Sequence, residues 1–187
     1  NSVHAMVFAD FNNDGYLDMA KSSDATSSAR TISINNGDLT FTSSTSALPQ
    51  GYRGLGWGDY DNDGDVDLVG RDTNNSTSPD VMIDNGAADG LSWTESNPSN
   101  NNNEAAMFVD IDGDGDLDIW NMGDNDAWHR QDCGNAFSAQ DGLPGLANDD
   151  LPNGEGCTAA DFTNDGYVDL MWNDANGSGS TQAWTSD

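Results

Sequence analysis

A nine-residue acidic pattern occurs four times in this chain of 187 residues and constrains its fold more than any other feature. The copies are DFNNDGYLD from Asp10, DYDNDGDVD from Asp59, DIDGDGDLD from Asp110 and DFTNDGYVD from Asp161. Their starts lie about 50 residues apart, and a fixed period of this length is typical of proteins built from stacked repeats.

Short apolar segments flank every copy. AMVFA, LGWG, AAMFV and CTAA precede the four acidic loops, and LDMA, VDLVG, LDIW and VDLM end or follow them. Runs of this length and composition, bounded by Gly, Asn and Asp, are typical of strands. The acidic pattern is therefore expected to form a loop that joins two strands.

The remainder of each repeat adds two further strand-like segments. The third segments are TISINNG, DVMIDNG, DAWHRQD and QAWTSD, and an aromatic-containing segment (LTFTS, LSWTE or NAFSA) follows in the first three repeats. Four-stranded units at this period indicate β-propeller blades. We predict an all-β, propeller-like domain over residues 1–187, with antiparallel blades at about 1–50, 51–101, 102–153 and 154–187, the last incomplete.

The loop composition predicts calcium sites. Calcium takes six to eight oxygen ligands from carboxylates, amides, carbonyls and water. A glycine at position 6 permits the sharp turn that brings the earlier oxygens together. We expect side chains at positions 1, 3, 5 and 9 and the carbonyl at position 7 to bind one ion per loop: Asp10, Asn12, Asp14, Tyr16 and Asp18; Asp59, Asp61, Asp63, Asp65 and Asp67; Asp110, Asp112, Asp114, Asp116 and Asp118; Asp161, Thr163, Asp165, Tyr167 and Asp169.

An EF-hand and an ion-free acidic turn are the alternatives to such a calcium loop. An EF-hand needs a glutamate at position 12 and flanking helices, whereas position 12 here is Lys21, Gly70, Asn121 or Trp172 and the flanks resemble strands. An acidic turn that binds no ion accounts for one copy more easily than for four in register. Thr163 is a weaker ligand than aspartate, so the fourth site is expected to be the weakest.

The charge balance excludes some partners and favours a location. The chain has 33 acidic and 5 basic residues, for a formal net charge of -28. Nucleic-acid binding needs clustered Lys and Arg, so no nucleic-acid partner is expected. No apolar run is long enough to enter a membrane, and the acidic surface suits a secreted or cell-surface protein.

The four loops and the turn NNGDLTF resemble the FG-GAP/VCBS repeats of integrin-α-type β-propellers. In that family, calcium lies in the loop between the first two strands of a blade, and the propeller serves as an extracellular platform for recognition or adhesion. The resemblance implies these properties for this chain, with Thr163 as the departure from the ligand pattern. It implies no ligand-binding residues, because the FG and GAP segments themselves are hardly visible.

Smaller features add further expectations. Cys133 and Cys157 form one disulfide between neighbouring repeats or remain two buried thiols. Asn74, Asn75 and Asn176 fit the N-glycosylation sequon. Tryptophans on the predicted strands are expected in the core, with Trp128 and Trp184 at matching positions of their blades.

No catalytic pattern surrounds the two histidines, and we expect no enzymatic activity. Three function classes stay open: an extracellular adhesion or recognition module that binds a protein or glycan, a structural subunit that binds copies of itself, and a carbohydrate-binding or polysaccharide-lyase-type propeller. The fourth repeat stops before a fourth strand. A strand from further chain or from another copy is therefore expected beside residues 181–186.

Overall fold

The computed structural model describes residues 3–23, 31–47, 54–71, 79–84, 93–96, 103–123, 127–131, 137–140, 154–174 and 181–185. Its secondary structure there is entirely β. None of these residues forms a helix that could cross a membrane. The all-β prediction is confirmed.

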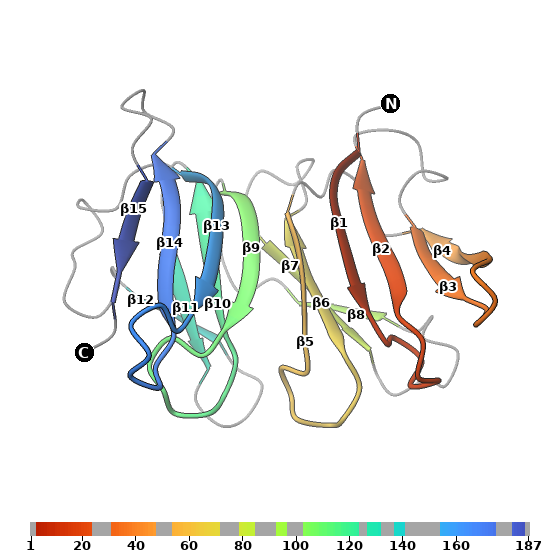
Figure 1. The fold of residues 1–187 in the computed structure, drawn as a ribbon, viewed down its shortest axis with the longest axis horizontal. Helices are drawn as coiled ribbons and strands as arrows, with labels where there is room; N and C mark the ends of the chain where they lie inside the picture. The colour runs from red at the N-terminus through yellow and green to blue at the C-terminus, as the bar shows by residue number, and fades with distance from the viewer. Residues whose placement is uncertain are drawn as a thin grey trace.

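In the described ranges, fifteen strands form four antiparallel sheets, each from consecutive strands (Figure 1). The first sheet contains β1 (Val3–Ala9), β2 (Asp18–Ser23), β3 (Thr31–Asn35) and β4 (Phe41–Ala47). The second contains β5 (Leu55–Gly58), β6 (Asp67–Arg71), β7 (Pro79–Asp84) and β8 (Trp93–Ser96). The third contains β9 (Asn103–Val109), β10 (Asp118–Gly123), β11 (Ala127–Gln131) and β12 (Phe137–Gln140). The fourth contains β13 (Gly154–Ala160), β14 (Asp169–Asp174) and β15 (Thr181–Trp184).

The strand order within each sheet follows the sequence, as in a propeller blade. The first strands lie next to one another from sheet to sheet, and the four acidic loops emerge on the same side (Figure 1). The predicted blade-like units are confirmed as an arrangement of sheets. The described strands do not show a closed ring.

The cores lie between successive sheets rather than inside any of them. On β9, Ala106 and Phe108 pack toward the second sheet, whereas Met107 and Val109 pack toward the fourth. This follows from the two-residue period of a strand, which sends alternate side chains to opposite faces. A strand buried on both faces reads as a continuous apolar run, as AAMFV does.

Glycine sets the close approach of the second and third sheets. A Cβ on Gly58 would lie 2.8 Å from a methyl carbon of Leu117 and 3.0 Å from the ring of Phe108. The Phe108 ring also stacks on Tyr60, with ring centroids 6.0 Å apart. Phe108 is thus held between a strand glycine and a loop aromatic from the neighbouring sheet.

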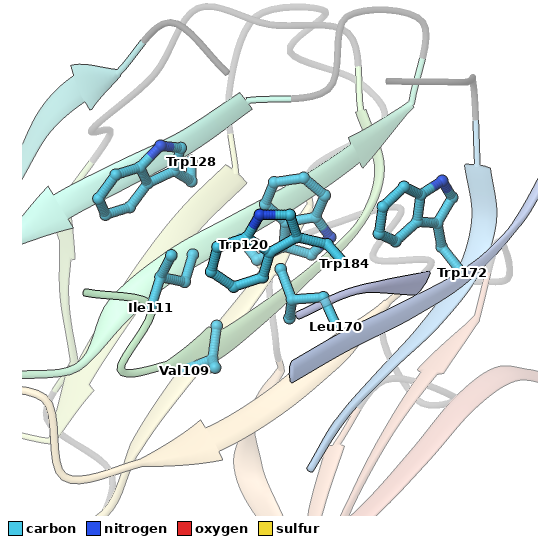
Figure 2. Packing of buried hydrophobic residues seen from close by; sticks show 7 residues of the cluster. All are labelled: Val109, Ile111, Trp120, Trp128, Leu170, Trp172 and Trp184. Carbon is cyan, nitrogen blue, oxygen red and sulfur yellow. The ribbon is translucent and has the colours of Figure 1, made fainter. Parts of the chain in front are cut away.

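Four tryptophans fill the core between the third and fourth sheets (Figure 2). Trp120, Trp128, Trp172 and Trp184 are all buried there, which confirms the expected core role. The expected match between Trp128 and Trp184 is wrong by one residue. Trp128 pairs with Trp120, whereas Trp184 pairs with Leu170, the equivalent of Ile119. A one-residue shift reverses the face of a strand, so these two indoles enter one core from facing sheets.

Candidate metal centre

Each acidic loop occupies the same place in its sheet, between the first and second strands. The hairpin registers pair Ala9 with Asp18, Gly58 with Asp67, Val109 with Asp118 and Ala160 with Asp169. We call residues 10–18, 59–67, 110–118 and 161–169 the first, second, third and fourth loops. Position 9 of each loop is therefore the first residue of a second strand.

Two residues in every loop have a left-handed backbone. The glycines at position 6 have φ values of 87° (Gly15), 97° (Gly64), 96° (Gly115) and 95° (Gly166), as the sequence predicted. Position 4 is also left-handed, at Asn13, Asn62, Gly113 and Asn164. Sequence reasoning missed this second turn. Its signal was the restriction of position 4 to Asn and Gly, the residues that adopt this conformation most readily.

Carboxylates at the start of the loops bind the backbone that curls around them. In the second loop, Asp59 accepts hydrogen bonds from the backbone N–H groups of Asp63 and Gly64, both at 3.1 Å. Asp61 accepts one from Asp63 N–H at 3.3 Å, and Asp63 accepts one from Asp65 N–H at 2.9 Å. Each carboxylate keeps lone pairs beyond these bonds, so backbone ordering and cation binding are compatible.

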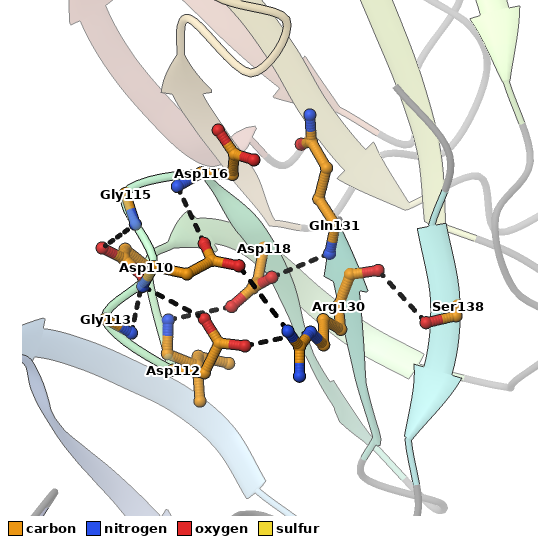
Figure 3. Close-up of polar contacts among 11 residues, drawn as sticks. Asp110, Asp112, Gly113, Gly115, Asp116, Asp118, Arg130, Gln131 and Ser138 are labelled. Carbon is orange, nitrogen blue, oxygen red and sulfur yellow. Dashed lines mark hydrogen bonds and ion pairs between the residues drawn. The ribbon is translucent and has the colours of Figure 1, made fainter. Parts of the chain in front are cut away.

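The aspartates at position 9 are completely buried and have a structural role of their own. One oxygen of Asp118 accepts from Ile111 N–H at 2.9 Å, and the other accepts from Gln131 N–H at 2.8 Å (Figure 3). Asp18 bonds Phe11 and Asn35 in the same way. In the first and third loops, the position-9 carboxylate thereby joins its loop to the third strand.

Carboxylate oxygens converge in two of the loops. Asp59, Asp61 and Asp67 each place one oxygen within 4.8 Å of the other two, and Asp110, Asp112 and Asp118 do the same. Oxygens at such separations can share one cation, because calcium–oxygen distances are about 2.3–2.6 Å. These are the two sets of three acids found among the described residues.

Burial and mutual repulsion disfavour the charged forms of these acids. Burial is the largest cause that raises the pKa of Asp61, and the neighbouring Asp63 carboxylate adds to it. Burial followed by the charge of Asp114 likewise raises the pKa of Asp112. Burial raises the pKa of Asp118 to about 7, although its two backbone hydrogen bonds oppose the shift. A bound cation would reverse these penalties.

The first and fourth loops have the same backbone but fewer acids. Asn12 takes position 3 in the first loop and accepts from Asp14 N–H at 3.2 Å. In the fourth loop, Thr163 N–H instead donates to Asp169 at 3.0 Å. In both loops, the position-1 carboxylate (Asp10 or Asp161) accepts a 2.9 Å hydrogen bond from the N–H of the glycine at position 6. Thr163 is an outlier in the structure as well as in the sequence.

Neighbouring loops contact one another through positions 4 and 7, which sequence reasoning did not foresee. Asn13 donates a 2.6 Å hydrogen bond to Asp65, and Asn62 donates a 3.4 Å bond to Asp116. At the next step, a Cβ on Gly113 would lie 3.3 Å from the ring of Tyr167. In the second, third and fourth loops, the side chain at position 7 thus faces the preceding loop. The expected role of the position-7 carbonyl as a ligand, including that of Tyr16, stays a prediction.

A cation from the protein itself lies beside the third loop, and sequence reasoning missed it. The Arg130 guanidinium on β11 lies 3.0 Å from Asp112 and 3.8 Å from Asp114 (Figure 3). Its only sequence signal was the segment DAWHRQD, where a charged residue stands at the place of an isoleucine in TISINNG.

Several expectations fall wholly or partly outside the described residues. Cys157 lies with its sulfur 3.1 Å from that of Met107, but Cys133 lies outside, so the disulfide stays a prediction. Asn74, Asn75 and Asn176 also lie outside. On the described side, β15 pairs with β14, and the expected further strand beside residues 181–186 stays a prediction.

The fold and loops define a repeat protein of propeller-like blades with acidic hairpin loops. Residues 10–70 match the family model of the FG-GAP-like repeat. The match spans the first two loops, confirms the resemblance inferred from the sequence, and is consistent with a member of the FG-GAP repeat family. A search of curated proteins found no match.

Proposed function

We propose that this protein is an extracellular calcium-binding repeat module of adhesion or recognition, with one structural calcium per loop and no catalytic activity. The observation that carries the proposal is the convergence of Asp59, Asp61 and Asp67 in the second loop, each with an oxygen within 4.8 Å of the other two. Asp67 is completely buried, so water does little to stabilise its charge and a cation would do more.

Calcium suits the donors better than other common metals do. Every side-chain donor in the loops is an oxygen, without thiolate or imidazole, which favours a hard cation over zinc or copper. The left-handed residues at positions 4 and 6 curve the loop backbone, so that oxygens from several positions can point toward one cation. A cation with six to eight ligands needs such an arrangement. The formal charge of -28 gives each bound ion a favourable long-range field.

Calcium stoichiometry tests this proposal. Equilibrium dialysis followed by metal analysis should find one calcium per loop at millimolar free calcium, and magnesium should compete poorly. Asp59→Ala should lose one ion. Asp38→Ala removes the same charge from the exposed turn between β3 and β4 and should lose none. Absence of bound calcium from the unaltered protein at millimolar concentration would refute the proposal.

The adhesion or recognition role is supported by the resemblance to FG-GAP repeats together with the acidic surface. The partner class we propose is an extracellular protein or glycan that carries basic or calcium-bridged groups, since a surface this acidic favours such partners. Binding to immobilised extracellular proteins and to a glycan array, each with and without calcium, would test it. Calcium-independent binding, or none on either panel, would count against this role.

A second candidate is a subunit that assembles with further copies of this chain. Met6, Phe8 and Leu17 are 51%, 52% and 59% exposed on the outer face of the first sheet. The equivalents of Phe8, which are Trp57 and Phe108, each pack on a loop aromatic from the preceding sheet. Negative-stain microscopy and sedimentation would reveal rings or filaments that Phe8→Asp disperses. A monomer at high concentration would exclude this candidate.

A further inference from the structure

The third loop differs from the second in its surroundings rather than in its own ligands. Both loops have aspartate at positions 1, 3, 5, 7 and 9. Arg130 contacts the third loop, through its Nε at 3.0 Å from Asp112 Oδ2 and its Nη2 at 3.8 Å from Asp114 Oδ2 (Figure 3). Counting carboxylates alone would rank the two loops as equal.

Arg130 occupies the oxygens that the loop backbone leaves unused. The Oδ1 atom of Asp112 accepts from Asp114 N–H at 3.3 Å, and the Oδ1 atom of Asp114 accepts from Asp116 N–H at 3.0 Å. The Arg130 guanidinium forms ion pairs with the Oδ2 atoms of Asp112 and Asp114. A metal ion ligated at positions 3 and 5 would therefore compete with the arginine for the same two oxygens.

The position of Arg130 has a clear equivalent in the first sheet. Asn35 N–H donates to Asp18 as Gln131 N–H donates to Asp118, so the preceding residues, Ile34 and Arg130, correspond. Ile34 has no charged group that could pair with the carboxylates of the first loop. In the second sheet, the register that pairs Leu68 with Met82 places Ile83 there. The arginine is thus peculiar to the third sheet among these three.

We propose that Arg130 is a resident counter-cation that lowers the calcium affinity of the third loop below that of the second. It also keeps the third loop ordered when calcium is scarce. This inference rests on the proposed function, because it assigns a different calcium affinity to each of two loops with identical acids. The protein then responds to calcium over a wider concentration range than equal sites would give.

The test needs one reporter per loop, and the chain provides it. The backbone N–H of the position-6 glycine donates to the position-1 carboxylate in all four loops, so the amide NMR signals of Gly15, Gly64, Gly115 and Gly166 report each site separately. Calcium titrations followed at these signals give one affinity per loop. The unaltered protein should fill the second loop at lower calcium than the third.

Arg130→Met should raise the calcium affinity of the third loop about tenfold. This is the change expected when a unit positive charge near a divalent ion is removed from a solvated site. Lys21→Met makes the same change in net charge on β2 and should leave the third loop unchanged. The reverse substitution, Ile34→Arg, should weaken the first loop by a similar factor without altering the third. It also tests the inference if Arg130→Met folds poorly.

Equal affinities of the second and third loops, or an unchanged or weaker third loop in Arg130→Met, would overturn the inference while calcium binding itself persists. Failure of the proposed function looks different, because no glycine signal would then move with calcium in any variant. Tightening by Lys21→Met as large as that by Arg130→Met would also refute the local role of Arg130. Net charge alone would then account for the effect.

Discussion

Replacing Asp118 by alanine should destabilise the protein even when calcium is absent. The change removes the acceptor for two buried backbone N–H groups, those of Ile111 and Gln131. Each orphaned buried donor costs about 1–3 kcal/mol. Loss of the burial penalty on the carboxyl, which raises its pKa to about 7, offsets part of this cost. A net loss of about 3 kcal/mol is expected, equivalent to a fall in Tm of about 9 °C for a chain of this size.

Asp114→Ala is the matched control, because it makes the same substitution in the same loop. Asp114 accepts from Asp116 N–H at an exposed position, where water can replace it. In excess EDTA, thermal unfolding followed by tryptophan fluorescence should show a fall in Tm of less than about 3 °C for this variant. Equal small shifts for both variants in EDTA would refute the structural role of Asp118 and leave calcium as its only purpose.

Three further predictions concern charge and pH. Asp63→Ala should release more calcium at low free calcium than Asp165→Ala, because its loop has one more ligand carboxylate; equal losses in dialysis would contradict this. Burial lowers the pKa of His129 to about 4, so the unfolded chain binds more protons below pH 6.5. The contribution of His129 to the free energy of unfolding should then fall by about 1.4 kcal/mol per pH unit from 6.5 toward 4, while the raised pKa of Asp118 contributes a slope of opposite sign. In urea unfolding, the free energy of the unaltered protein relative to His129→Leu should therefore fall by about 1.4 kcal/mol per pH unit over this range. Because Asp118 keeps a proton below its pKa of about 7, calcium affinity at the third loop should fall about tenfold per pH unit from 7 to 5, and a flat profile at the Gly115 signal would exclude this.

The local features of the fold were predictable because each is written within a few residues. The apolar segments around Asp59 fixed strands β5 and β6, and Gly64 marked a turn that only a left-handed residue makes easily. The equal spacing of the loops then fixed the repetition of sheets. These signals need no knowledge of what packs against them.

The features that escaped prediction depend on contacts between sheets. Trp184 lies one register position away from the predicted match with Trp128, because the dipeptide AW in DAWHRQD and QAWTSD aligns the two residues by sequence although their strands are offset by one residue. The hydrogen bond from Asn13 to Asp65 joins residues from different repeats, and the period alone does not say which loop positions meet. The sequence does not distinguish Arg130 from other surface charges, because its role depends on its contact with Asp112 of the third loop.

The central claim is that calcium holds this fold together, and thermal unfolding in chelator tests it most directly. Saturating one site at 100 times its dissociation constant contributes about 2.7 kcal/mol, equivalent to about 5–11 °C in Tm. We predict that excess EDTA lowers Tm by at least this amount, that added calcium restores it, and that equimolar magnesium does not. A melting curve identical in EDTA and in millimolar calcium would contradict the account.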